Sequence, residues 1–445
     1  MREEIVEQFH EQERLNNTET PAVLFEKSKK RRGKKTIALL LLIVIVENIF
    51  ILAYWSYSGE NQFNERIQRE QQIQNEGFIT LANGRYTGGT DFGFFCGQGT
   101  FSFNDGSSLD GEWKNNLLSG NGNLIVVEKG QYKGNFKDSL KDGKGTFTWD
   151  NGAVYSGEWK DDEINGTGEY SNDSVHYQGE FANNKFSSGK CDFKNDLGTY
   201  ELTYKDGEVV AANITFSNGA VYSGGASDTQ ITGMGTLQYP SGDEYSGEFS
   251  DGHRDGNGVY TWSTGESYDG VWDDDSMTGS GTYTYTNGST LNGDFQNNNF
   301  LNGSYHTEND FGEYTFTIVN GSPTAVSLTL TDGTTYEGDM DENGLNGSAQ
   351  ITYSNGDTYS GHVSNGTKSG RGQYYWSNGA SYDGEWTNDE MEGTGTYMYP
   401  SNEDGYELMG SFTAGVPNGE CQYYANATTS YKTTWSNGTC VKVEE

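Results

Sequence analysis

The chain has 445 residues, a formal net charge of −36, 62 glycines and 30 tyrosines, but only 5 prolines. This composition excludes collagen and proline-rich linkers and indicates turns between aromatic strands. A mean hydropathy of −0.78 leaves too few aliphatic residues for several conventional cores. The acidic excess lies beyond residue 55 and disfavours nucleic acid as a partner, because a phosphate-binding face needs clustered Lys and Arg.

Residues 36–55 read TIALLLLIVIVENIFILAYW, which as a helix spans about 30 Å, the thickness of a bilayer core. The basic run KSKKRRGKK at 27–35 precedes this segment, so we expect residues 1–35 to form a cytoplasmic tail. The sequence predicts an uncleaved signal anchor in the cell membrane, a single-pass transmembrane helix with everything after it on the non-cytoplasmic side. A cleaved signal peptide is the alternative, although no small-x-small site follows the apolar run.

Glu47 and Asn48 lie near the middle of this apolar segment. A polar group there costs about 2.5 to 3.5 kcal/mol on insertion scales and tends to find a partner, so either residue can mediate helix association. A protonated Glu47 tolerated in an apolar span is the alternative. Residues 56–78 have a polar, helix-friendly composition without a sustained heptad, which predicts a stalk; a short oligomerising helix is the alternative.

From residue 79 onwards the pattern Tyr-x-Gly-x-(Trp/Phe) recurs about every 23 residues, and a Gly-x-Gly pair precedes most copies in the same phase. Self-similarity at such a period indicates stacked supersecondary units, each too small to bury a core alone. The candidate repeat anchors are Tyr132 and Gly134; Tyr155, Gly157 and Trp159; Tyr177 and Gly179; Tyr245 and Gly247; Tyr268, Gly270 and Trp272; Tyr359 and Gly361; and Tyr382, Gly384 and Trp386.

The unit at 143–165 shows the expected logic. Two alternating segments flank Asp150-Asn151-Gly152, which predicts a β-hairpin with a turn of residues suited to positive φ. Tyr155, Gly157 and Trp159 are two apart and share one face, and we expect the missing side chain at Gly157 to admit a ring from the adjoining unit. The Gly-x-Gly pair should let the chain turn tightly into the next hairpin.

These residues resemble the MORN (membrane occupation and recognition nexus) repeat family, whose motif is this hairpin, as in VYSGEW, EYSGEF, SYDGVW and SYDGEW. The resemblance covers roughly residues 79–445. It implies an all-β repeat array, an elongated twisted antiparallel sheet of consecutive 23-residue β-hairpins, and roles in scaffolding, membrane association and protein binding. These roles are diverse, so the resemblance specifies the fold better than the function.

Three units depart from the pattern, with TYELTY, EYTFTI and SYKTTW in place of the central glycine motif. They recur every five units, at Tyr200, Tyr314 and Tyr431, which predicts three blocks at residues 79–211, 212–325 and 326–445. We expect the sheet to change its bend or twist at these degenerate units. Ordinary drift within one continuous sheet is the alternative.

No catalytic motif is evident: the histidines are scattered, and neither a P-loop nor a nucleophile elbow occurs. We therefore predict no enzyme activity, no cofactor and no metal site. Acidic turns such as Asp161-Asp162-Glu163 suggest weak calcium binding but lack the ligand spacing of a dedicated loop, and solvated charge that discourages aggregation is the alternative. Cys421 and Cys440 flank the last hairpin, which makes a capping disulfide one hypothesis and four free thiols the other.

The leading functional hypothesis is a membrane-anchored scaffold or protein-interaction array on the non-cytoplasmic side. The alternative is a cell-surface carbohydrate or cell-wall adhesin that uses exposed Tyr and Trp rings as stacking platforms. Phospholipid binding through the array is disfavoured by its negative charge.

Overall fold

The computed structural model describes residues 59–227, 230–400 and 406–444. The predicted cytoplasmic tail, the predicted membrane segment with Glu47 and Asn48, and the first residues of the predicted stalk lie outside this part of the chain. Within the described ranges, no helix has the length and apolarity needed to span a bilayer.

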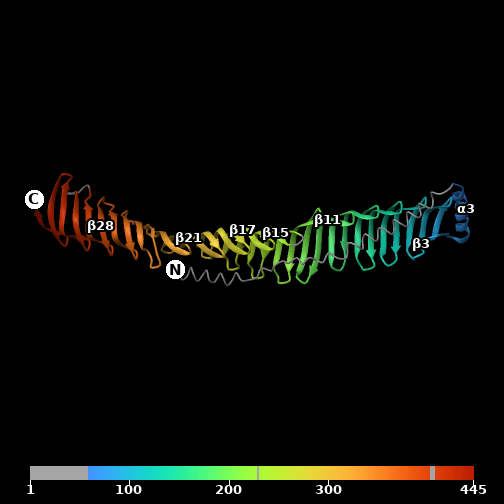
Figure 1. The fold of residues 1–445 in the computed structure, drawn as a ribbon, viewed down its shortest axis with the longest axis horizontal. Helices are drawn as coiled ribbons and strands as arrows, with labels where there is room; N and C mark the ends of the chain where they lie inside the picture. The colour runs from blue at the N-terminus through green and yellow to red at the C-terminus, as the bar shows by residue number, and fades with distance from the viewer. Residues whose placement is uncertain (1–58, 228–229, 401–405, 445) are drawn as a thin grey trace. The chain divides into compact units, whose positions relative to one another are not determined.

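The described chain consists of one helix and 33 strands, which confirms the predicted all-β class. Its contacts divide it into two compact units, and the division falls within β16 (Glu244–Ser250). In each unit, strands pair antiparallel with their neighbours in the chain and lie side by side in chain order (Figure 1). This arrangement confirms consecutive β-hairpins.

The N-terminal unit contains one helix and the first fifteen strands. They are α3 (Gly59–Glu76), β1 (Ile79–Leu81), β2 (Gly84–Asp91), β3 (Phe94–Phe103), β4 (Ser108–Lys114), β5 (Leu117–Val126), β6 (Gly130–Lys137), β7 (Leu140–Trp149), β8 (Val154–Lys160), β9 (Glu163–Ser171), β10 (Val175–Ala182), β11 (Lys185–Asn195), β12 (Gly198–Lys205), β13 (Glu208–Phe216), β14 (Val221–Ala226) and β15 (Ile231–Gln238).

The C-terminal unit contains the strands that follow β16. They are β17 (His253–Thr261), β18 (Ser267–Asp273), β19 (Ser276–Thr284), β20 (Thr290–Gln296), β21 (Asn299–Asn309), β22 (Gly312–Val319), β23 (Ser322–Leu330), β24 (Thr335–Asp339), β25 (Gly347–Thr352), β26 (Thr358–Ser364), β27 (Thr367–Tyr375), β28 (Ser381–Thr387), β29 (Glu390–Met398), β30 (Glu407–Thr413), β31 (Val416–Asn426), β32 (Thr429–Ser436) and β33 (Thr439–Glu444).

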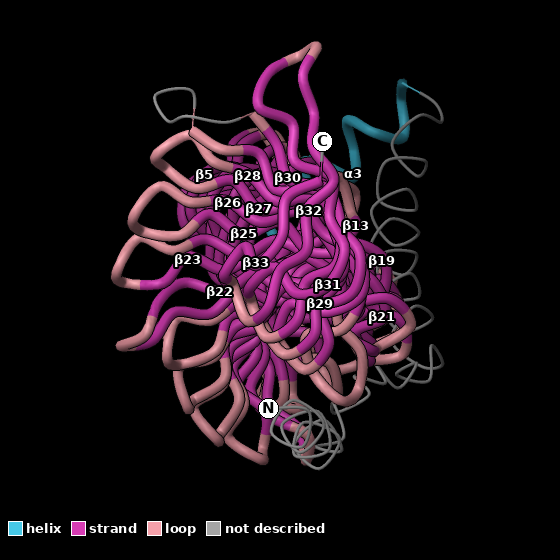
Figure 2. Tube along the Cα trace, turned by 90° about the vertical axis from the view of Figure 1, so that its left-hand side faces the viewer, coloured by secondary structure: helices cyan, strands magenta, loops and turns pink. Residues whose placement is uncertain are grey.

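Two kinds of turn connect the strands, seen as pink loops at the strand ends in Figure 2. Within the unit at 143–165, β7 and β8 are joined at Asp150-Asn151-Gly152, as predicted. Between units, the connection is Asp161-Asp162, whose φ angles of 50° and 72° describe a two-residue turn with both residues left-handed. Asp and Asn tolerate this conformation, so the inter-unit turn needs no glycine.

The Gly-x-Gly pair therefore does not make the turn, and that prediction was wrong. Gly166 and Gly168 lie inside β9. Gly157 pairs with Gly168 but Trp159 pairs with Ile164, so β9 bulges between these pairs, and Gly166 takes the positive φ of 93° that the bulge requires. The second glycine has a separate role, in ring packing.

The ring that covers the glycines comes from the same strand. A Cβ at Gly157 would lie 2.5 Å from the Cα of Gly168 and would overlap the Tyr155 hydroxyl, and a Cβ at Gly168 would overlap the Tyr155 ring itself. We predicted that a ring from the adjoining unit would fill the space at Gly157, but the ring comes from Tyr155 of the same unit. Tyr155 extends over its own Gly157 and onto the second glycine of the following unit, and this contact couples the two units.

The predicted stalk is in part a helix that packs on the first strands. Arg66, Glu70 and Ile73 of α3 are three or four residues apart and so lie on one helix face. The Arg66 guanidinium lies 4.2 Å from the centroid of the Phe94 ring, Glu70 accepts a 2.9 Å hydrogen bond from the Gly93 amide, and Ile73 packs against the core. The helix therefore covers the start of the sheet in this unit.

The degenerate units continue the strand pairing. Leu202 takes the central position in β12, where it is buried and pairs with Cys191 on one side and Ala212 on the other. Phe316 in β22 is likewise buried between Tyr305 and Val326. Larger side chains thus replace the ring-over-glycine contact without interrupting the ladder.

Candidate interaction surface

In each unit, one face of the sheet is filled by the repeat's own aromatic rings. Tyr155 is fully buried and its ring meets that of Trp159 edge-on, with centroids 5.4 Å apart. The Tyr155 hydroxyl donates to the Glu158 carbonyl at 3.0 Å, and Trp159 Nε1 donates to the Gly145 carbonyl at 3.2 Å. Burial raises the pKa of Tyr155 to about 12. The polar atoms of both rings are therefore satisfied within the fold, as buried Tyr and Trp require.

The other predicted anchors repeat this arrangement, and we call this surface the ring face. The anchor tyrosines Tyr132, Tyr245, Tyr268, Tyr359 and Tyr382 are fully or almost fully buried, as are Trp272 and Trp386, and the hydroxyls of Tyr132, Tyr268, Tyr359 and Tyr382 donate to the carbonyl three residues on. Tyr177 is half-buried, and its Gly179 pairs with Gly168 and Gly189.

The ring face leaves few exposed rings for sugar stacking. The Tyr and Trp residues that the adhesin hypothesis needs at the surface are mostly buried in the anchors. Among the described residues of β27, Tyr375 does have half of its surface exposed, but it lies on the opposite face of the sheet from the anchor rings.

The opposite face, which we call the outer face, is polar at the position after the anchor in twelve of the thirteen units. The residue after each anchor points there, and the sequence holds Thr87, Asp110, Lys133, Ser156, Gln178, Ser223, Ser246, Asp269, Asn292, Glu337, Ser360 and Asp383 at this position. The thirteenth unit has Met409 instead. At this position the thirteenth unit therefore differs from the other twelve.

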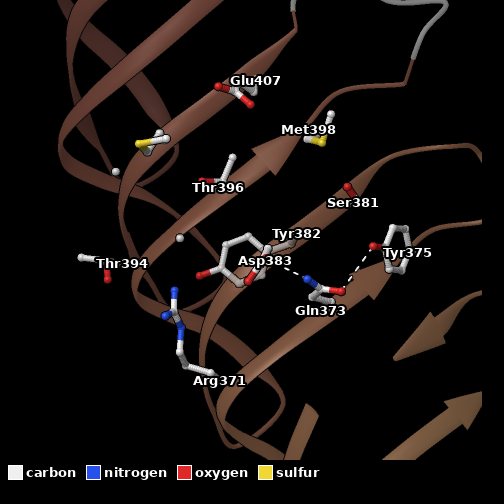
Figure 3. Close-up of a pocket in the computed structure, with 13 residues that line it drawn as sticks. Arg371, Gln373, Tyr375, Ser381, Tyr382, Asp383, Thr394, Thr396, Met398 and Glu407 are labelled. Atoms are coloured by element: carbon white, nitrogen blue, oxygen red, sulfur yellow. Dashed lines mark hydrogen bonds between the residues drawn. The ribbon is translucent and has the colours of Figure 1, made fainter. Parts of the chain in front are cut away.

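A groove on the outer face surrounds Met409 and encloses about 620 Å³ (Figure 3). Met398 on β29 and Tyr375 on β27 also line it, and Met398, Met409 and Tyr375 are 40 %, 46 % and 50 % exposed. Ser381 lies between Tyr375 and Met398 in the cross-strand row, and Glu407 follows Met398. The groove thus brings three partly exposed large apolar side chains to one region of the outer face.

The charged and polar groups of the groove are arranged around these apolar side chains. Gln373 Nε2 donates to Asp383 Oδ2 at 2.8 Å, and the Tyr375 hydroxyl donates to Gln373 Oε1 at 3.3 Å. Arg371 lies at one end and Glu407 at the other (Figure 3). With two carboxylates against one guanidinium, the lining is acidic overall.

The acidic turns are used within the fold. Asp162 is buried, and its Oδ1 accepts hydrogen bonds from both the backbone amide and the Nζ of Lys141, each at 2.9 Å. Asp275 has the same role opposite Arg254. In the described ranges, no group of three or more His, Cys, Asp or Glu side chains is placed to hold a metal ion. The turns act as hydrogen-bond acceptors between units, which neither sequence hypothesis anticipated.

The hypothesised disulfide between Cys421 and Cys440 is not formed. All four cysteines are free. Cys421 lies on β31 and Cys440 on β33, with β32 between them. Strands are about 4.8 Å apart, so two strand spacings exceed the reach of a disulfide.

The unit that contains Cys191 departs from the glycine register of the regular units. Gly189, and not Cys191, pairs with Gly179, while Cys191 pairs with Tyr177 and Leu202. Phe181 pairs with Phe186 at the same spacing as Trp159 with Ile164, so the change of register arises in the shorter bulge between this pair and the pair of Glu180 with Ser188.

The fold thus defines a repeat protein built of consecutive antiparallel hairpins. Ten segments of the chain match the MORN repeat family, at residues 86–108, 110–125, 132–154, 155–174, 177–197, 222–244, 245–267, 268–290, 359–381 and 382–403. The chain therefore carries MORN repeats. Residues 198–221, which hold the first degenerate unit, lie outside these segments.

Among solved structures, the chain is similar to a mutant of the TCP10 domain of Danio rerio CPAP, with 13 % identity and a TM-score of 0.27 over 52 % of this chain and 98 % of that one. It is also similar to the TCP domain of Drosophila melanogaster SAS-4 in complex with a proline-rich motif of Ana2, with 10 % identity and a TM-score of 0.14 over 50 % and 90 % of the two chains. No curated protein matches the chain.

Proposed function

We propose that this chain is a membrane-anchored MORN-repeat scaffold whose array, on the non-cytoplasmic side, binds a protein partner through its outer face. MORN repeats indicate a repeat scaffold or interaction array, and proteins that carry them are generally not enzymes. The observation that carries the binding proposal is the groove lined by Tyr375, Met398 and Met409, on a face where the residue after the anchor is polar in the other twelve units.

The anchoring part of the proposal rests on sequence. Residues 36–55 have the length and apolarity of a membrane helix, and the basic run at 27–35 favours a cytoplasmic N-terminus. The strongly acidic remainder is compatible with an exposed, soluble array, because high net charge keeps proteins in solution.

The chemistry of the groove specifies the class of partner. Methionine is flexible and polarisable and adapts to varied apolar side chains, so it suits a protein ligand better than a sugar. Asp383 and Glu407 line the groove and the whole chain is acidic. We therefore infer a partner segment that combines large apolar side chains with Lys or Arg.

Anchoring is tested by adding protease to intact cells that express the full chain, with antibodies against each end. The proposal expects loss of the array and survival of the basic tail. Protection of the array in intact cells, with digestion only after permeabilisation, would reverse the proposed topology.

Binding is tested by selecting a random peptide library, displayed on phage, against the full chain in detergent. The proposal expects enriched peptides that are basic and contain aromatic or large aliphatic residues. Selection of acidic or wholly polar peptides would contradict it. Saturable binding of cell-wall glycans that is lost with Tyr375→Ala would instead favour the adhesin.

A further inference from the structure

A recurring hydrogen bond links seven of the described inter-unit turns, those whose second residue is not glycine, to the strand one unit earlier. The second residue of the turn accepts, through its side-chain oxygen, a proton from the backbone amide of a residue 20 or 21 positions upstream. We call this contact a rung. The described rungs join Phe95 to Asn116, Leu118 to Ser139, Lys141 to Asp162, Ile164 to Asn184, Arg254 to Asp275, Met277 to Asn298, and Lys368 to Asp389.

The residue types at the two ends of a rung change together. Where the strand residue is apolar, as at Leu118, Ile164 and Met277, the acceptor is Ser or Asn. Where the strand residue is Lys or Arg, the acceptor is Asp in all three rungs. The three charged rungs lie 113 and 114 residues apart, one in each five-unit block.

Each cation lies among the aromatic rings of the ring face. Lys141 Nζ is 5.0 Å from the Trp159 ring, Arg254 Cζ is 4.3 Å from Trp272, and Lys368 Nζ is 5.4 Å from Trp386. The side chains of Lys141, Arg254 and Lys368 are 8 %, 9 % and 12 % exposed, and those of their partners Asp162, Asp275 and Asp389 are 2 %, 18 % and 50 % exposed, so all three cations are buried but only the first pair is buried at both ends. These are the positions at which other units bury Leu, Ile or Met.

Such pairs are a poor means of adding stability. Removing two charges from water costs about as much as their attraction returns, and apolar replacements of similar volume are often as stable or more so. One Asp162 carboxylate oxygen is buried without a hydrogen-bond partner, which adds to the cost. A feature repeated three times at the same place in the block therefore calls for another explanation.

Near-identical hairpins create a problem of register. A hairpin can skip its neighbour and pair with the next one, leaving a 23-residue unit looped out, or pair with the same hairpin of a second copy. A skip past Asp162 would bring Lys141 to Asn184, with a buried cation unpaired. A skip past Ser139 would bring Leu118 to Asp162, with a buried carboxylate unpaired. Breaking a buried pair in this way is strongly unfavourable, whereas skipping between two neutral rungs carries no such penalty.

We propose that the three charged rungs are register keys, which make each five-unit block pair only in its native order. Buried polar pairs that specify register are known in other repeat-based assemblies, and setting register or switching states is the best-attested use of such pairs. The keys select the native pairing against its near-degenerate competitors and do not raise the stability of the native array.

The test replaces each charged rung by a neutral rung of the same chain. The variant combines Lys141→Leu with Asp162→Ser, Arg254→Met with Asp275→Asn, and Lys368→Ile with Asp389→Asn. The control exchanges residues among neutral rungs, with Leu118→Ile and Ser139→Asn, and Met277→Leu and Asn298→Ser. Full-length chains in detergent are unfolded in denaturant, refolded, and compared by hydrogen exchange with mass spectrometry and by sedimentation.

Wild type and control should refold to a single monomeric species. The neutralised variant should give at least about a tenfold larger fraction of chains with one unprotected unit-length segment or with an exchanged dimer, since each mispairing then leaves no buried charge unpaired. When the neutralised variant is purified without denaturation, its thermal unfolding temperature should equal or exceed that of wild type. Refolding to one species would overturn the proposal. So would a lowered unfolding temperature before any refolding, because the pairs would then simply stabilise.

Discussion

Tyr155 lies over Gly168, a glycine of the following hairpin, in a position where any Cβ would overlap its ring. Its hydroxyl simultaneously donates to the Glu158 carbonyl, the group that opposes the bulge at Gly166. The contacts of Tyr155 thus stabilise its own strand, the bulge and the packing against the next unit. Gly157 and Gly168 therefore make room for this ring, whereas Gly166 supplies the positive φ of the bulge.

Gly157→Val should be far more disruptive than Ser156→Val, although both are strand residues. A Cβ at Gly157 meets the backbone of Gly168 and the Tyr155 hydroxyl, whereas Ser156 lies on the exposed outer face. Overpacking of this kind costs about 1 to 3 kcal/mol, and outer-face substitutions stay within about 0.5 kcal/mol. Hydrogen exchange of peptides covering β7 to β9 measures the difference, and equal protection in the two variants would refute the packing described for Tyr155.

Lys141→Leu alone should destabilise its unit by about 3 to 5 kcal/mol, because the buried Asp162 carboxylate loses its counter-charge. Adding Asp162→Ser should restore most of this loss, since the pair then matches Leu118 and Ser139. Denaturant unfolding followed through local hydrogen exchange gives both values. A double variant as unstable as the single one would show that the rung geometry does not transfer between units.

The Arg254 and Asp275 pair should make its unit sensitive to acid. Burial raises the pKa of Asp275, but the hydrogen bond from the Arg254 amide, the Arg254 charge and the His253 hydrogen bond outweigh it, and the pKa falls below its ordinary value. An Asp with a lowered folded-state pKa contributes stability that is present above about pH 4 and is lost as pH falls through the folded pKa.

Protection of β17 to β19 should therefore decline below about pH 4 in wild type and decline less in the Arg254→Met, Asp275→Asn double variant. Hydrogen exchange at several pH values, corrected for intrinsic rates, makes the comparison. Parallel declines in the two proteins would assign the acid sensitivity to other carboxylates.

Limited proteolysis of the full chain in detergent should cut the array first at 195–215 and 309–329, where Leu202 and Phe316 replace the central glycine. In a repeat array stability is roughly a sum of unit and interface terms, and local opening begins where an interface is altered. The turns there expose Leu197 and Phe311. First cuts inside the regular units at Tyr155 or Tyr268 would instead favour ordinary drift within a continuous sheet.

The hairpins and the buried anchors were predictable because a period of 23 residues and alternation by two are properties of the chain itself. The turn at Asn151-Gly152 followed from turn chemistry in the same way. The role of Gly166 was not predictable from one unit, since a glycine that makes a bulge and one that makes a turn look alike until strand pairing is known. The rung from Lys141 to Asp162 spans 21 residues, and only the register reveals it.

The groove was missed for a related reason. Met409 follows an anchor leucine and falls in the one interval of 26 residues, so its position in the repeat was obscured. Comparing the residue after every anchor would have revealed it as the only apolar residue among thirteen. Its neighbours Met398 and Tyr375 come from other strands and needed the cross-strand register.

The most direct test of the interaction account is the affinity of a selected basic, apolar peptide for two matched variants of the full chain. Met398→Thr with Met409→Asn removes the two methionines of the groove, and Val259→Thr with Val271→Thr removes another diagonal apolar pair on the outer face, from β17 and β18. The account predicts at least about tenfold weaker binding for the first variant, equivalent to about 1.4 kcal/mol, and unchanged binding for the second. Equal affinity of the groove variant and wild type would contradict it.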